Sequence, residues 1–219
     1  MRPMKHGYTN RTVGGAAGVV KHYQGPDAAE RQETERRFVA ALQGRLPVPQ
    51  VVGAEPGVLR FSFVEGVQGQ ELIDAGAARA VLRSAGAVLR RLHDLPADVL
   101  GTPQGRVAVH GDFGPNNLLL DPGSNEVTAL IDWEFAHFGA AVEDLAWCEW
   151  IVRTHHPAHA GDLDAFFDAY GPVPPWEARQ AEMVARCEAL EAFCRRWDPD
   201  GAGVRQWRER LEATAAWTE

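Results

Sequence analysis

The sequence predicts an α+β fold in two parts, a small mixed β/α part over residues 1–65 and a mainly helical part over residues 66–219. Glycine-rich and β-branched segments around one helical pattern are concentrated in the first part, which is typical of a small sheet with one helix. In the second part apolar residues recur at three- and four-residue steps, the spacing of helix faces. Charge divides at the same place: residues 1–65 carry 9 Lys and Arg against 6 Asp and Glu, and residues 66–219 carry 13 against 24.

The overall composition is that of an ordinary globular domain. The 219 residues are 45% hydrophobic and 24% charged, which excludes a disordered, collagen-like or coiled-coil chain. The net charge of −8, and the balance of −11 (13 minus 24) after residue 65, disfavour nucleic acid and anionic membranes as partners. Three cysteines without a CxxC pair, no apolar leader and no apolar run near about 18 residues lead us to expect a cytoplasmic protein.

The first part should contain two pairs of strands separated by one helix. Residues 7–25 combine glycines with β-branched residues, so we expect one or two short strands with a glycine turn. A helix should begin near Pro26 and stop at Gly44, because the proline-rich segment that follows prevents its continuation. Two more strands are expected at residues 50–52 and 58–64, on either side of a Pro-Gly turn.

The second part should be mostly helical, interrupted by a strand and a hairpin. Apolar residues at steps of four, three and four place one helix between about Asp74 and His93; they are Val81, Ala85, Val88 and Leu92. A strand at residues 107–109 leads into a polar loop, and a β-hairpin at residues 118–131 follows. Further helices are expected at residues 141–153, 161–170, 175–197 and 203–217.

The polar loop at residues 110–117, together with the aspartate after the hairpin, has the residue types that phosphoryl transfer requires. Such a reaction needs a carboxylate that orients an attacking hydroxyl and accepts its proton, and oxygen ligands that hold Mg²⁺ between phosphates. Asp112 could be this carboxylate, and Asn117 and Asp132 could be the Mg²⁺ ligands. Turn chemistry alone, the alternative interpretation, also places Asp and Asn in such loops.

Two linked motifs in this region resemble a known family. The loop reads His-Gly-Asp-x4-Asn from His110, and Ile-Asp-Trp-Glu from Ile131 follows after one hairpin. Together they resemble the aminoglycoside phosphotransferase and choline kinase family, a small-molecule branch of the protein-kinase-like fold. The resemblance implies a bilobal protein-kinase-like fold, with a reduced mixed N-lobe over residues 1–65 that binds nucleotide. The C-lobe over residues 66–219 would then hold the catalytic loop, the metal site and the acceptor pocket.

The resemblance extends to the nucleotide site and implies ATP or GTP as the phosphoryl donor. Lys21, in a Val-Val-Lys strand, would hold the α- and β-phosphates and would pair with Glu35 on the next helix. A strand-edge lysine and a solvent-facing helix glutamate are the alternative interpretations of these two residues. The other residues implied to contact nucleotide are Thr9 and Asn10 in a short Gly-Tyr-Thr-Asn loop and Phe63 and Val64 in the hinge between the lobes.

Two further residues should support the catalytic loop. By resemblance Asp144 braces the loop, and His110 bonds to the backbone near Asp132, although a role for His110 as a base is the alternative. Only 11 residues separate Asp132 from Asp144, which leaves no room for the activation segment with which a protein kinase docks a peptide. We therefore expect a small-molecule acceptor. The role of Glu134 stays open.

The acceptor is expected to be cationic, because the second part of the chain is strongly acidic. Candidate amine-binding carboxylates are Glu143, Glu149, Asp162 and Asp164. Core packing is the preferred interpretation of three tryptophans that could instead line an amine pocket, Trp147, Trp150 and Trp176.

These patterns predict an ATP- or GTP-dependent O-phosphotransferase that requires Mg²⁺ and acts on a hydroxyl of a small, cationic molecule such as an aminoglycoside. Antibiotic resistance would be the consequence. Two alternatives stay open, a metabolic kinase for choline, ethanolamine or a sugar, and a non-catalytic nucleotide-binding pseudokinase. The expected partners are the nucleotide and the acceptor, without nucleic acid or membrane.

Overall fold

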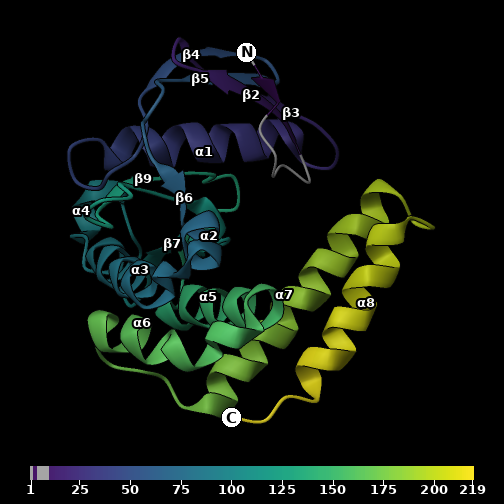
Figure 1. Ribbon diagram of the computed structural model, residues 1–219. Coiled ribbons are helices and arrows are strands. Elements are labelled where there is room, and N and C mark those ends of the chain that lie inside the picture. Colours follow the sequence, from purple (N-terminus) through teal and green to yellow (C-terminus); the bar gives the residue numbers. More distant parts are fainter. Residues whose placement is uncertain (1, 4–9) are drawn as a thin grey trace.

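The N-terminal lobe is a five-stranded antiparallel sheet with one helix beside it (Figure 1). The computed structural model describes residues 2–3 and 10–219. The strands lie in the order β1-β2-β3-β5-β4. Their bounds are β1 Arg2–Pro3, β2 Asn10–Gly15, β3 Gly18–Tyr23, β4 Val51–Glu55 and β5 Val58–Phe61.

Helix α1 (Ala28–Leu42) lies between this sheet and the rest of the molecule. Phe38 and Leu42 on α1 have no exposed surface, so the helix buries an apolar face completely. The expected glycine turn joins β2 to β3. At Gly18, where β3 begins, φ is 129° and a Cβ would lie 3.0 Å from the carbonyl oxygen of Phe61. Glycine therefore fits this position without strain, and a larger residue does not.

The C-terminal lobe contains two small sheets. In one sheet the strand order is β6-β8-β9, and in the other β10 pairs with β7. The strand bounds are β6 Val67–Gln68, β7 Val107–Val109, β8 Leu118–Leu120, β9 Val127–Leu130 and β10 His137–Gly139. The boundary expected after residue 65 falls between β5 and β6, in the segment that connects the two lobes.

Helices make up most of the C-lobe. They are α2 Gly69–Leu72, α3 Ala78–His93, α4 Ala97–Leu100, α5 Ala141–His155, α6 Leu163–Tyr170, α7 Trp176–Trp197 and α8 Ala202–Ala215. Helix α3 packs against α6, and α7 packs against both α5 and α8. Figure 1 shows α7 and α8 as an antiparallel pair that extends toward the N-lobe. None of the helices within residues 10–219 is long and apolar enough to cross a membrane.

One continuous apolar core runs through both lobes. It includes Phe38 of α1, Leu59 of β5, Leu82 and Leu89 of α3, and Trp133, which follows β9. A second apolar cluster lies where α5 packs on α7, and its buried members are Ala146, Trp147, Trp150, Ile151, Met183 and Cys187. The first core fixes the sheet and α1 relative to the hairpin that precedes Asp132, which is the relationship that the candidate site requires.

Some elements differ from those expected. The helix expected from about Asp74 begins at Ala78, because Gly76 with φ 92° interrupts the π-helical segment Ile73–Ala77. Strand β10 was not expected, since its three residues show no β pattern and it forms only by pairing with the distant strand β7. The strand expected over residues 58–64 ends at Phe61, and the residues after it form the connection between the lobes.

Candidate active site

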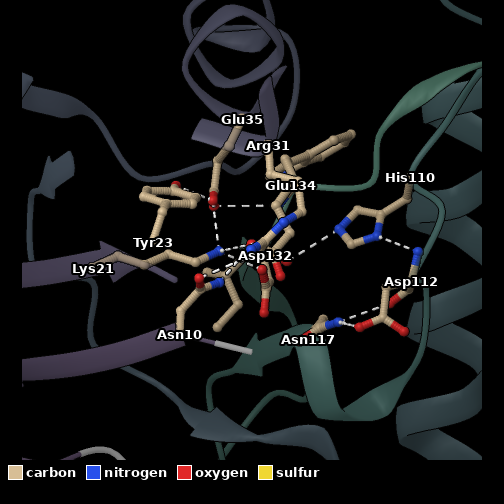
Figure 2. A network of polar contacts seen from close by, with 12 residues as sticks. Asn10, Lys21, Tyr23, Arg31, Glu35, His110, Asp112, Asn117, Asp132 and Glu134 are labelled. Atoms are coloured by element: carbon tan, nitrogen blue, oxygen red, sulfur yellow. Dashed lines mark hydrogen bonds and ion pairs between the residues drawn. The ribbon is translucent and has the colours of Figure 1, made fainter. Parts of the chain in front are cut away.

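A buried lysine joins the two lobes at the centre of the candidate site (Figure 2). Lys21 Nζ on β3 lies 2.6 Å from Glu35 Oε2 on α1 and 2.5 Å from Asp132 Oδ1, just after β9. Burial by itself would lower the pKa of Lys21, but the carboxylates of Asp132, Glu35 and Glu134 outweigh burial and raise this pKa. Lys21 is therefore a fixed positive charge at any working pH.

The partners of Lys21 are themselves held in place. The Tyr23 hydroxyl donates to Glu35 Oε2, and the backbone N–H of Trp133 donates to Glu35 Oε1 at 3.2 Å. Burial and the Glu35 charge raise the pKa of Tyr23, so its hydroxyl keeps its proton and stays a donor. Asp132 has φ 68°, a left-handed conformation that side-chain-bearing residues seldom adopt, and in this conformation its carboxylate meets Lys21.

A second ion pair lies next to the first, and sequence reasoning missed it. Glu134 is 3% exposed and accepts hydrogen bonds from Arg31 Nη1 at 2.7 Å and from Asn10 Nδ2 at 2.5 Å. Its Oε2 also lies 3.5 Å from Lys21 Nζ. One feature of the sequence could have indicated that Arg31 faces the site. Arg31 precedes Glu35 by four residues, so both lie on the same face of α1.

The carboxylate of Asp112 is held from two sides. Asn117 Nδ2 donates to Asp112 Oδ2 at 2.8 Å, and Trp147 Nε1 donates to Asp112 Oδ1 at 2.8 Å. Burial raises the pKa of Asp112 to about 6, against the lowering effect of the Arg186 charge. A carboxylate with this pKa is ionised at neutral pH and still has a useful affinity for a proton. Neither the hydrogen bond from Trp147 nor the nearby charge of Arg186 was expected from the sequence.

The backbone of the 110–117 loop is bonded to a buried carboxylate. Asp144, which has no exposed surface, accepts hydrogen bonds from the backbone N–H groups of His110 at 2.7 Å and Gly111 at 2.9 Å. His93 Nε2 lies 3.2 Å from the same carboxylate. Burial by itself would raise the pKa of Asp144, but the His93 contact and the His110 backbone bond lower this pKa overall. Asp144 therefore holds the start of the loop as an ionised acceptor.

His110 connects the loop to the segment before Asp132. The backbone N–H of Asp112 donates to His110 Nδ1 at 3.2 Å, and His110 Nε2 lies 3.0 Å from the carbonyl oxygen of Ile131. Because the carbonyl can only accept, these two bonds specify the neutral ring with its proton on Nε2. Burial lowers the pKa of His110 further toward this neutral form.

Asp132 and Asn117 present oxygen atoms that suit a divalent cation (Figure 2). Among the described residues, carboxylate oxygens of Glu35, Asp132 and Glu134 lie within 4.8 Å of one another. Their three negative charges exceed the two positive charges of the adjacent lysine and arginine, and Asp132 is the most open of the three with a side chain 32% exposed. Asn117 Nδ2 faces Asp112, and no hydrogen bond in the described part of the chain uses Asn117 Oδ1. This donor set fits Mg²⁺, which prefers carboxylate and amide oxygens.

The two expected hinge residues lie in the connection between β5 and β6. The Ser62 N–H donates to a backbone carbonyl before β4 at 2.8 Å, and the Glu65 carbonyl accepts from a β9 threonine at 2.8 Å. Between these fixed points, no backbone hydrogen bond within residues 10–219 uses Phe63 or Val64. Their backbone groups are available to a planar ligand. Thr9, also expected to contact nucleotide, lies outside the described residues.

One of the predicted amine-binding roles is wrong, that of Glu149. Glu149 is 1% exposed and is paired with Arg153 at 2.9 Å and Arg179 at 2.7 Å, so it is a structural ion pair with no surface for a ligand. Trp147 and Trp150 are 4% and 1% exposed, which supports core packing as the interpretation of both. The spacing along helix α5 could not distinguish inward-facing from outward-facing carboxylates, because its apolar residues occur on most of its faces.

A comparison with protein families places this arrangement of residues in a known group. The model described as "Phosphotransferase enzyme family" matches residues 1–106 and 102–182. The chain belongs to the phosphotransferase enzyme family. The matched residues of this phosphotransferase-family chain include Lys21, Glu35, Asp112, Asn117, Asp132 and Asp144.

Individual relatives agree with this assignment. Hygromycin-B 4-O-kinase of Escherichia coli is 37% identical to the chain over 150 residues, which are 63% of this chain and 36% of that enzyme, so the match spans little more than a third of that relative. The structure of the GDP and kanamycin complex of APH(2")-IIia superposes on this chain with a TM-score of 0.76 at 14% identity. The match covers 98% of this chain and 92% of that chain. The structure of macrolide 2'-phosphotransferase MphH from Brachybacterium faecium superposes with a TM-score of 0.67 at 19% identity. The match covers 100% of this chain and 93% of that chain. These structures confirm the predicted bilobal α+β fold.

Proposed function

We propose that this chain transfers the terminal phosphoryl group of ATP or GTP to a hydroxyl of a small cationic molecule, with aminoglycosides as the first candidates. The observation that supports this most is the buried Lys21, held between Glu35 and Asp132 (Figure 2). Asp112 lies on a neighbouring loop with its carboxylate separately held. A fixed cation, a metal-binding carboxylate and an independent base are the parts that phosphoryl transfer requires.

The nucleotide would be bound by the N-lobe and the hinge. Lys21 would hold the α- and β-phosphates, and Glu35 would position the lysine. The free backbone groups of Phe63 and Val64 would bind the base of ATP or GTP. Asn10, the first residue of β2, and Thr9 before it in the sequence would also contact the nucleotide.

The reacting groups would be held by the C-lobe. Asn117 and Asp132 would bind Mg²⁺, which when present neutralises charge on the β- and γ-phosphates. Asp112 would orient the acceptor hydroxyl and take its proton. The acceptor oxygen would bond to the γ-phosphorus as the bond from that phosphorus to the β,γ-bridging oxygen breaks, which releases a nucleoside diphosphate. His110 and Asp144 would keep the loop in place.

The acceptor class is supported by charge and by the relatives. Aminoglycosides are polycations, and residues 66–219 carry 13 Lys and Arg against 24 Asp and Glu. Among the relatives are a hygromycin-B 4-O-kinase and an enzyme with bound kanamycin. Phosphorylation of such antibiotics would make them inactive. A cytoplasmic location, where ATP and GTP are available, is part of the proposal and agrees with the three free cysteines.

The test is transfer of labelled phosphate from ATP and from GTP, with Mg²⁺, to hygromycin B, kanamycin, a macrolide, choline, ethanolamine and a sugar. The expected result is transfer to an aminoglycoside, and a loss of at least about 100-fold in turnover for Asp112→Asn. Magnesium–nucleotide should raise the melting temperature of the wild type and of this variant equally. Transfer to choline, ethanolamine or a sugar alone would replace the acceptor proposed here. Nucleotide binding without any transfer would indicate the non-catalytic alternative.

A further inference from the structure

Trp147 on α5 donates its indole N–H to Asp112 Oδ1 at 2.8 Å, although the two residues are 35 positions apart in the sequence. We propose that Trp147 is a positioning residue for phosphoryl transfer, which fixes the rotation of the Asp112 carboxylate so that one of its lone pairs faces the acceptor hydroxyl. This inference rests on the proposed function, because Trp147 acts through the base of that reaction.

Two donors on different oxygens specify the orientation of a carboxylate. Asn117 Nδ2 bonds to Asp112 Oδ2, but this bond alone leaves the group free to rotate until its other oxygen or another lone pair is used. The Trp147 bond to Oδ1 removes this freedom. A hydrogen bond to a charged acceptor is stronger than one between neutral groups, so this indole is an effective restraint. Each oxygen still has capacity to accept another proton.

The indole is itself held rigidly by the second apolar cluster. Trp147 stacks on Trp150 with ring centroids 4.5 Å apart and planes 5° from parallel. Trp150 Nε1 donates to Thr214 Oγ1 on α8 at 2.8 Å. The centroid of the Trp147 ring also lies 5.6 Å from Arg186 Cζ on α7. A ring fixed by three helices can define the position of a reacting group more closely than a loop side chain can.

Trp150 provides a matched control. Both tryptophans are buried in the same stack, and each donates one indole hydrogen bond of 2.8 Å. They differ in the acceptor, which is Asp112 for Trp147 and a helix threonine for Trp150. Trp147→Phe and Trp150→Phe each keep an aromatic ring and remove one donor. A packing role would make the two variants lose similar amounts of kcat, and a positioning role makes Trp147→Phe lose much more of it than Trp150→Phe.

The experiment measures kcat and KM of the full chain with Mg²⁺, nucleotide and the acceptor found active. For Trp147→Phe, kcat is expected to fall about 10- to 100-fold while the nucleotide KM stays within about twofold, because a misplaced reacting group affects turnover more than binding. Trp150→Phe keeps the ring that stacks on Trp147 and the Trp147–Asp112 bond, so it should lower the melting temperature and reduce kcat no more than about threefold. In the Asp112→Asn background, Trp147→Phe should cause no further loss, because its effect passes through Asp112.

Several results would overturn the inference. They are an unchanged kcat for a folded Trp147→Phe variant, an equal loss for Trp150→Phe, and an additive loss in the Asp112→Asn background. Trp147→His, which retains a ring N–H, should recover part of the lost kcat. If Trp147→Phe does not fold, the inference requires that Trp147→His keeps kcat within about tenfold of the wild-type value. An inactive wild type would contradict the proposed function itself, whereas an active wild type with a neutral Trp147→Phe variant would contradict this inference alone.

Discussion

Lys21 and Asp132 are 111 residues apart in the sequence, and Lys21 Nζ lies 2.5 Å from Asp132 Oδ1. Lys21 lies on β3 of the N-lobe, and Asp132 follows β9 of the C-lobe. Because Lys21 also pairs with Glu35 on α1, this ion pair ties the sheet, the helix and the C-lobe hairpin together at one point. The groups proposed to bind phosphate and metal are therefore assembled only when the two lobes are correctly packed.

Removing the Lys21 charge should impair both stability and activity. Lys21→Met leaves the carboxylates of Glu35 and Asp132 close together without their cation, which should cost about 3–5 kcal/mol of unfolding free energy. Activity should fall about 100-fold or more, because a charge aimed at the phosphates is lost. Urea unfolding and steady-state kinetics measure the two effects. Arg60→Met, which breaks an exposed pair with Glu55, should change neither. Wild-type activity in Lys21→Met would contradict its proposed role.

The Arg31–Glu134 pair should be a major source of stability. Arg31 and Glu134 have side chains only 5% and 2% exposed, so Arg31→Met leaves a buried carboxylate without its main partner and should cost about 3–5 kcal/mol. Arg36→Met, on the same helix, breaks a pair with Glu33 whose side chains are 45% and 59% exposed, and should cost less than about 1 kcal/mol. Chemical denaturation of the two variants measures their losses of unfolding free energy. Similar losses for both would show that burial does not set the strength of these pairs.

Gly111 should not tolerate a side chain. Its φ is 79°, and a Cβ would collide with the carbonyl oxygen of Phe135. Gly111→Ala should therefore cost about 3 kcal/mol or more, from the unfavourable backbone conformation and the collision together. Gly105 has φ 73°, and a Cβ added there would meet nothing within 4 Å, so Gly105→Ala should cost only about 1–2 kcal/mol. Thermal melts compare the two. A loss of kcat is expected for Gly111→Ala alone, and equal melting temperatures would contradict the collision.

The buried His110 should make stability depend on pH. Burial lowers the pKa of His110 in the folded chain, against the raising effects of Asp144 and Asp132, while in the unfolded chain this pKa is about 6.5. Above about pH 6.5 the ring is neutral in both the folded and the unfolded chain, so the folded chain keeps its full stability. As pH falls below this value, the unfolded chain binds a proton that the folded chain does not, and stability decreases toward the folded pKa.

This dependence can be measured as the difference in urea midpoint between pH 8 and pH 5.5. His110→Gln should be less stable than wild type at pH 8, because the ring contacts with the loop and Ile131 are changed. Its midpoint should nevertheless decrease less between the two pH values than that of the wild type. An identical decrease in both proteins would assign the pH dependence to other groups.

Much of the fold followed from local patterns. The helix expected between Pro26 and Gly44 is α1, Ala28–Leu42, and the strands and helices that were expected after it lie within a few residues of their observed bounds. The short elements β6, α2 and α4 were not expected. Proline, glycine and apolar periodicity act over one or two turns of chain, so they can be recognised without the rest of the molecule. Strand β10 could not be recognised, because three residues form a strand there only through pairing with β7.

The sequence by itself determined the order of the elements and the linked motifs around Asp112 and Asp132, because residue type and spacing along the chain are enough to define both. Only the tertiary structure decided which charged groups are buried together. It paired Glu134 with Arg31, placed Trp147 against Asp112 and removed Glu149 from any ligand surface. The physical reason is that burial and ion pairing depend on contacts between distant segments, whereas the same residue types are common on solvated surfaces.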